Sequence, residues 1–230
     1  MLVTICRLYE TYDDASQTVT ALKAAGVPAT DASIISNNSD NWYSPSPASS
    51  RESAIPAVAG RADRDTKARD RYDDRIEAAG VGAAIGATAG TAAGLLTLLA
   101  IPGVGPVVGL GWLLPILGGA AIGGVTGGLV GALTRVGVSE EDAQAYAEGV
   151  RRGGTLVTAR VPPGDAGRIE NVMDPSAVDI RDRRAEYSQS GWRSFDSNAA
   201  PYTAEQVRTE RDLHSAPAPA PARRQGVSQR

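Results

Sequence analysis

The sequence predicts an α+β protein of 230 residues, and three observations support this class. In residues 1–36 and again in residues 136–181, short apolar runs typical of strands alternate with segments whose apolar residues have helical spacing. Between these two parts, residues 78–134 form a stretch of 57 residues without a charged side chain. Beyond residue 181 the large apolar residues become sparse, which predicts a disordered tail over 182–230.

The first part, residues 1–36, predicts a β-α-β unit. Residues 2–8 are apolar on both faces, as expected of an interior strand. A helix is predicted over 13–25, where Ala15, Val19 and Leu22 recur at helical spacing before Gly26. Residues 32–36 then form the second predicted strand.

The second part, residues 136–181, predicts a matching unit. Residues 139–142 (Ser-Glu-Glu-Asp) resemble a capping box and start a helix. A strand over 155–161, a short helix near 169–173 and a last strand over 177–180 follow. Two such units commonly combine as a four-stranded antiparallel sheet with helices on one face, which is the ferredoxin-like arrangement.

The uncharged segment, 78–135, predicts a helical hairpin inserted between these halves. Glycine recurs there at every fourth position in two ladders: Gly82, Gly86, Gly90, Gly94, and Gly119, Gly123, Gly127, Gly131. Residues four apart share one face of a helix, so each ladder allows close packing of another helix. The predicted hairpin turn lies at Pro102, Gly103, Gly105 and Pro106.

The length of this hairpin predicts a membrane anchor. Residues 78–101 and 111–134 would each be a helix about 36 Å long, enough for a hydrocarbon core of about 30 Å. Arginines flank the hairpin and none lies at its tip, which predicts that both termini face the cytoplasm from the bacterial inner membrane. The alternative is a soluble assembly in which the hairpin packs against copies of itself. The missing charged face favours the bilayer.

Charge and residue types argue against several functions. Residues 37–77 are a linker followed by a segment of alternating charges, and the net charge of −3 gives no reason to expect nucleic-acid binding. Cys6 is the only cysteine, is expected in the core, and cannot form an internal disulfide. The only histidine, His214, falls in the predicted tail. We therefore expect no enzyme activity, no cofactor and no metal site.

Two aromatic residues stand out in the polar tail. Trp192 and Phe195 lie in the short segment 190–196, where most neighbours are polar or charged. They either dock onto a partner or fold back on the sheet, and the sequence does not distinguish these alternatives.

Three stretches carry a family resemblance: residues 4–37, the glycine-rich segment with 101–106, and residues 138–157. With these stretches, the chain resembles the bacterial general stress protein 17M-like family. The resemblance implies a role in the stress response and no reaction. Together with the uncharged segment, it predicts a non-enzymatic, membrane-associated stress protein whose expected partners are the lipid bilayer and further copies of itself. The soluble self-assembling module is the alternative, and a small-ligand sensor on the sheet face has support only from fold analogy.

Overall fold

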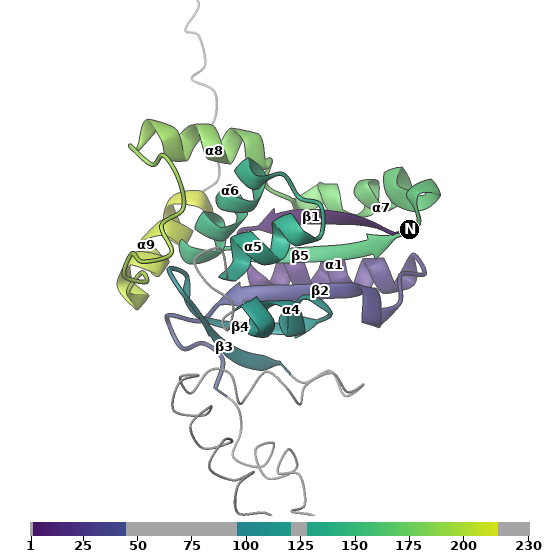
Figure 1. Cartoon of the computed structure of the whole chain (residues 1–230), viewed down its shortest axis with the longest axis horizontal. Helices are drawn as coiled ribbons and strands as arrows, with labels where there is room; N and C mark the ends of the chain where they lie inside the picture. The colour runs from purple at the N-terminus through teal and green to yellow at the C-terminus, as the bar shows by residue number, and fades with distance from the viewer. Residues whose placement is uncertain (1, 45–95, 121–127, 216–230) are drawn as a thin grey trace, which may run out of the picture.

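The computed structural model describes residues 2–44, 96–120 and 128–215. Its centre is a five-stranded antiparallel sheet with strand order β1-β5-β2-β4-β3, packed with helices (Figure 1). The strands are β1 (Val3–Tyr9), β2 (Ala32–Asn37), β3 (Thr97–Ile101), β4 (Gly105–Gly111) and β5 (Thr155–Val161). The predicted α+β class is confirmed.

The first predicted unit is confirmed as β1, α1 (Tyr12–Ala24) and β2. The helix begins after Thr11, whose hydroxyl accepts a hydrogen bond from the Asp14 backbone N–H at 3.1 Å. β1 and β2 are not neighbours in the sheet. β5 lies between them, antiparallel to both, so the two predicted units interlock through this strand.

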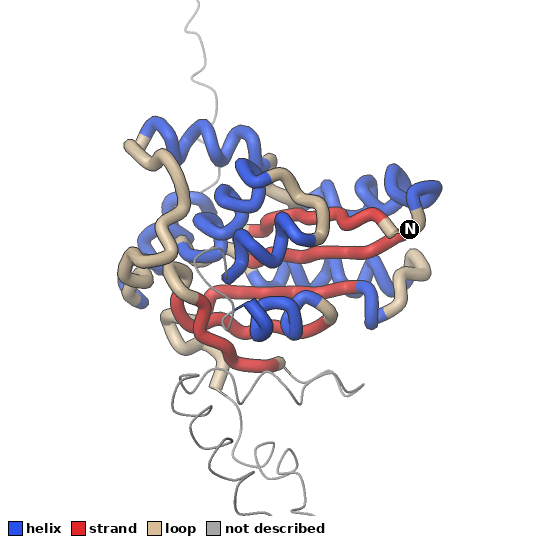
Figure 2. The backbone as a smooth tube through the Cα atoms, in the orientation of Figure 1, coloured by secondary structure: helices blue, strands red, loops and turns tan. Residues whose placement is uncertain are grey.

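Helices cover both faces of the sheet, although the sequence predicted helices on one face only (Figures 1 and 2). One core lies beneath α1 and α7 (Ala166–Met173) and contains Ile5 and Tyr9 of β1. The opposite core contains Cys6 and Leu8 and is covered by α4 (Leu113–Ala120), α5 (Gly128–Arg135) and α6 (Glu140–Arg151). The alternating residues of β1 are apolar on both faces because each face meets a helical layer.

The predicted pair of long helices is wrong over residues 97–111, most of which form strands. Residues 97–101 form β3 instead of the end of the first helix, and Gly111 ends β4 instead of starting the second. The turn at residues 102–104 therefore joins two strands. β4 pairs with β2 and β3, and its Val107 and Val108 are buried. A short apolar run fits an interior strand as well as a helix, which is why the sequence misled here.

The remainder of the second predicted helix appears as two separate elements. α4 and α5 have eight residues each, and the first residue of α5, Gly128, has φ +81°, which is not helical. Of the two ladders, Gly119 lies in α4 and Gly131 in α5, while these positions lie outside the described residues: Gly82, Gly86, Gly90, Gly94, Gly123, Gly127. Within the described ranges, no helix has the length and apolar character needed to cross a bilayer.

The C-terminal region also differs from prediction. The expected strand 177–180 is reduced to one bridge between Val178 and Leu8, because Asp179 caps a helix instead. Most of α8 (Ile180–Gln189) and all of α9 (Ala204–Ser215) lie within residues 182–215, so the predicted disorder is wrong there. Residues 216–230 lie outside the described residues. Of the two tail aromatics, Phe195 folds back on the sheet domain, which was one of the two alternatives, whereas Trp192 packs against α8. Phe195 packs against the core that α4, α5 and α6 cover, and the ring of Trp192 contacts the ring of Tyr187.

Candidate functional site

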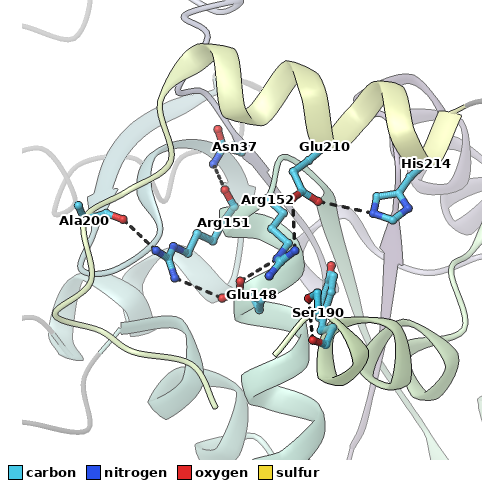
Figure 3. Close-up of polar contacts among 9 residues, drawn as sticks. Asn37, Glu148, Arg151, Arg152, Ser190, Ala200, Glu210 and His214 are labelled. Atoms are coloured by element: carbon cyan, nitrogen blue, oxygen red, sulfur yellow. Dashed lines mark hydrogen bonds and ion pairs between the residues drawn. The ribbon is translucent and has the colours of Figure 1, made fainter. Parts of the chain in front are cut away.

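A cluster of charged side chains lies where the C-terminal end of α6 meets α8 and α9 (Figure 3). Its centre is Glu148, a carboxylate only 1% exposed. The Glu148 carboxylate binds Arg152 Nε at 2.7 Å and Arg151 Nη1 at 3.5 Å. These arginines follow at positions i+3 and i+4, which places all three side chains on one side of the helix end. We call Glu148, Arg151, Arg152 and Glu210 the charged clamp.

Arg152 connects α6 to both C-terminal helices. Its Nη1 lies 3.3 Å from Glu210 Oε1 of α9, and its guanidinium lies 4.4 Å from the ring centroid of Tyr187 of α8. Burial tends to lower the pKa of Arg152, but the hydrogen bond and charge of Glu148 outweigh this and raise it. The guanidinium therefore stays charged, and one cation holds three helices together.

Arg151 fixes the segment that precedes α9. Its Nη2 donates to the backbone carbonyl of Ala200 at 2.9 Å, and its guanidinium lies 4.9 Å from the ring centroid of Tyr202. Its own carbonyl accepts from the Asn37 amide at 3.2 Å, so the helix end is also tied to the end of β2 (Figure 3).

A second arginine docks α9 onto the end of the sheet where β2 finishes and β5 begins. Arg211 donates to the carbonyl of Gly153 at 2.9 Å and to that of Asn37 at 3.3 Å, and its Nη1 lies 2.5 Å from Asp40 Oδ2. Val207 is fully buried beside Gly153, where an added Cβ would lie 2.8 Å from Val207 Cγ1. Polar contacts and one apolar contact thus carry the docking of α9.

The space beside the clamp is too small for a substrate. A cavity of about 10 Å³ lies among Leu8, Arg152, Tyr187, Glu210 and Arg211. Such a volume holds about one water molecule. The carboxylates and guanidiniums of the clamp bind one another, so the arrangement acts as a structural clamp between helices.

His214, which the sequence placed in the tail, belongs to this cluster. Its Nε2 lies 3.6 Å from Glu210 Oε2, one turn earlier on α9 (Figure 3). Sequence reasoning missed the cluster, although the Glu148, Arg151 and Arg152 spacing was visible. In the described ranges, no group of three potential His, Cys, Asp or Glu ligands is close enough to hold a metal ion.

A shallow polar groove of about 360 Å³ lies between α6 and α8. Two of its arginines are Arg181 and Arg193, both exposed, and a third, Arg184, binds Glu141 at 2.7 Å. Trp192 closes one side, but its indole nitrogen is covered and so does not face a ligand. The groove is therefore a surface depression without a buried group directed into it.

Cys6 is a core residue, as the sequence predicted. Its side chain is 5% exposed, and burial raises the pKa of its thiol to about 12, although the charge of Arg7 lowers it in part. The neighbouring Tyr146 hydroxyl donates to the Cys6 carbonyl at 2.8 Å. A thiol in this environment is a poor nucleophile.

We expect the protein to lose stability as the solution becomes alkaline. Burial raises the pKa of Cys6 and of Tyr9 to about 12 each, whereas in an unfolded chain these groups titrate near about 8.5 and 10. Above pH of about 8.5 the unfolded state therefore binds fewer protons than the folded state, and the free energy of unfolding falls with pH. Urea denaturation from pH 7.5 to 11 measures this decline.

The variant Cys6→Ala isolates the thiol contribution. It should flatten the first part of the decline, between pH of about 8.5 and 10, and leave the later part to the tyrosines. An unchanged slope in the variant would show that Cys6 is not buried as described.

No family model, curated protein or solved structure matches this chain. The resemblance to the general stress protein 17M-like family therefore stays a prediction from the sequence.

Proposed function

We propose that this chain is a non-enzymatic bacterial stress-response protein that works by association with further copies of itself. One observation supports this above others. The described part of the uncharged segment belongs to the sheet domain. It includes β3, which is the last strand of the sheet among the described residues and carries no charge. Uncharged edge strands invite pairing with another chain.

The arrangement of strands counts against the spanning hairpin that the sequence favoured. The Tyr43 hydroxyl donates to the Leu96 carbonyl at 3.2 Å, so the residues on either side of 45–95 lie close together. A single crossing within 45–95 would separate β3 from β2, although both belong to one sheet. Two crossings need about 40 mainly apolar residues. The uncharged part, 78–95, has only 18.

Contact with the lipid surface is the second candidate. The observation in its favour is the same run of 18 uncharged residues, which could lie against the bacterial inner membrane without crossing it. In this alternative the lipid bilayer, and not another copy, is the partner of residues 78–95.

The fold that we propose for this domain is a ferredoxin-like sheet with additional elements. β5 between β1 and β2, and the Val178 bridge on the outer side of β1, are consistent with that strand order. The hairpin of β3 and β4 extends the sheet, and α4, α5 and α6 cover the face that such sheets often leave open. These additions support a scaffold role, because they fill the face on which a ligand sensor would bind.

Light scattering on the full-length chain tests the proposal. We expect the mass to rise with concentration from 23.7 kDa to a multiple of it without lipid or detergent. Flotation with lipid vesicles of bacterial composition is the parallel measurement. A chain that stays monomeric but floats with vesicles would support the second candidate and contradict the first. A chain that does neither would contradict both.

A further inference from the structure

We propose that β3 is the self-association site, and that it pairs antiparallel with β3 of a second copy about a two-fold axis through Leu99. The two five-stranded sheets would then join as one continuous sheet. This inference rests on the proposed self-association and names the strand that carries it.

The hydrogen-bond pattern shows which groups of β3 face the free edge. The Asn38 backbone N–H donates to the Pro106 carbonyl at 2.8 Å, so Pro106 directs its backbone groups toward β2. Its partner in the register is Ala100. In an antiparallel ladder such a pair exchanges no hydrogen bonds, so the N–H and C=O of Ala100 point away from β4. By alternation, those of Leu98 do the same.

These four backbone groups have no strand partner among the described residues, because β3 is the last strand in the sheet order. Edge strands are usually protected by charges, proline or bulges. β3 has the sequence Thr-Leu-Leu-Ala-Ile, with none of these features, and β4 is uncharged as well.

The strand is complementary to itself. Pairing about Leu99 places Leu98 opposite Ala100 of the second copy, so that both pairs exchange backbone hydrogen bonds. Leu98 is 36% exposed and Ala100 is also exposed, on the same face of the strand. The large side chain of Leu98 would lie beside the small one of Ala100, and each copy would cover the exposed leucine of the other.

Charge does not oppose pairing at this edge. The chain has a net charge of −3, so two copies repel each other over most contact surfaces. The β3 edge presents no charge, which makes it a surface where two copies meet without this cost. At the turn, the strand is closed off by the C-terminal segment, because a Cβ on Gly103 would lie 2.7 Å from the carbonyl of Asp196. Pairing therefore does not extend into the turn beyond Ile101.

Two double variants with the same number of new charges test this register. In Leu98→Lys with Ala100→Lys, lysines lie opposite each other in both pairs, and we expect dimerisation to weaken about tenfold or more. In Leu98→Lys with Ala100→Glu, each lysine lies opposite a glutamate, and dimerisation should be kept. Sedimentation of the full-length chains measures both dissociation constants, and circular dichroism verifies that both variants fold.

Ala100→Pro gives an independent measurement. It removes an N–H that faces the edge and no hydrogen bond to β4, so we expect a folded monomer. If all three variants associate as strongly as the wild-type chain, the β3 site is overturned while the proposed function still stands. A wild-type chain that never associates would overturn both.

Discussion

Replacing Gly111 by alanine is expected to destabilise the protein by about 2 to 5 kcal/mol, through backbone strain and overpacking. Gly111 ends β4 with φ +106°, a conformation that side-chain-bearing residues rarely adopt. A Cβ there would lie 2.2 Å from the Ala32 carbonyl oxygen and 2.7 Å from the Ser33 Cα. Both atoms belong to the backbone of β2, which cannot move aside without disturbing the centre of the sheet. Urea denaturation measures the change.

Gly137→Ala is the matched control. Gly137 also has a positive φ, +97°, but nothing lies within 4 Å of an added Cβ. Its cost should therefore be limited to strain of about 1 to 2 kcal/mol. If residues 111–134 were one long helix, Gly111→Ala would instead be neutral or stabilising by up to about 1 kcal/mol. A Gly111→Ala variant as stable as the wild type would thus contradict the β4 assignment.

Replacing Glu148 by glutamine should cost about 3 kcal/mol of stability, because breaking a buried ion pair leaves an uncompensated charge. Glu148 is 1% exposed and is the carboxylate nearest to Arg152, at 2.7 Å. Glutamine keeps the size of the side chain, so the loss reports the charge. The same variant should loosen α9, since Arg152 also binds Glu210, and amide hydrogen exchange in α9 should become faster.

Glu141→Gln on the same helix provides the comparison. Glu141 also binds an arginine at 2.7 Å, Arg184, but its side chain is 80% exposed. Exposed pairs contribute about 0 to 1 kcal/mol, so this variant should change stability little and leave exchange in α9 unaffected. Equal effects of the two variants would mean that Glu148 is not buried as the structure shows.

Local signals predicted about half of the fold. β1, α1 and β2 were readable because apolar periodicity and the helix stop at Gly26 agree at short range. The same holds for α6, where Ser139 accepts from the Asp142 N–H at 3.2 Å as the capping box implied, and for β5. The position of β5 between β1 and β2 is a long-range pairing, and no local pattern encodes it.

The uncharged segment was misread because a lack of charged residues indicates that a segment is buried, but does not indicate whether protein or lipid buries it. Val107 and Val108 lie in an interior strand covered by protein, which requires the same apolar residues as lipid does. Pro102 directly follows β3 and Pro106 is the second residue of β4, so the two prolines fit a turn between strands as well as one between helices. Glycine in this segment also has a role outside helix pairing: a Cβ on Gly109, in β4, would lie 2.7 Å from Leu114.

The tail and the charged clamp were missed for a related reason. α8 and α9 contain few apolar residues, and their order depends on contacts such as Arg211 with Asp40, 171 positions apart. Glu148, Arg151 and Arg152 have the spacing of an ordinary solvent-exposed helix face. The carboxylate is buried at the end of α6 where α8 and α9 dock, and that docking leaves no signature in the local sequence.

Methyl NMR on the full-length chain tests most directly the central claim, that residues 97–111 are strands of the domain's own sheet. Leu110 lies opposite Ile34 in the register of β4 and β2, and both pack in the core beneath α1. We expect a methyl NOE between these two side chains, 76 positions apart, and strand-type chemical shifts for residues 105–111. Helical shifts over this range with no such NOE would contradict the account.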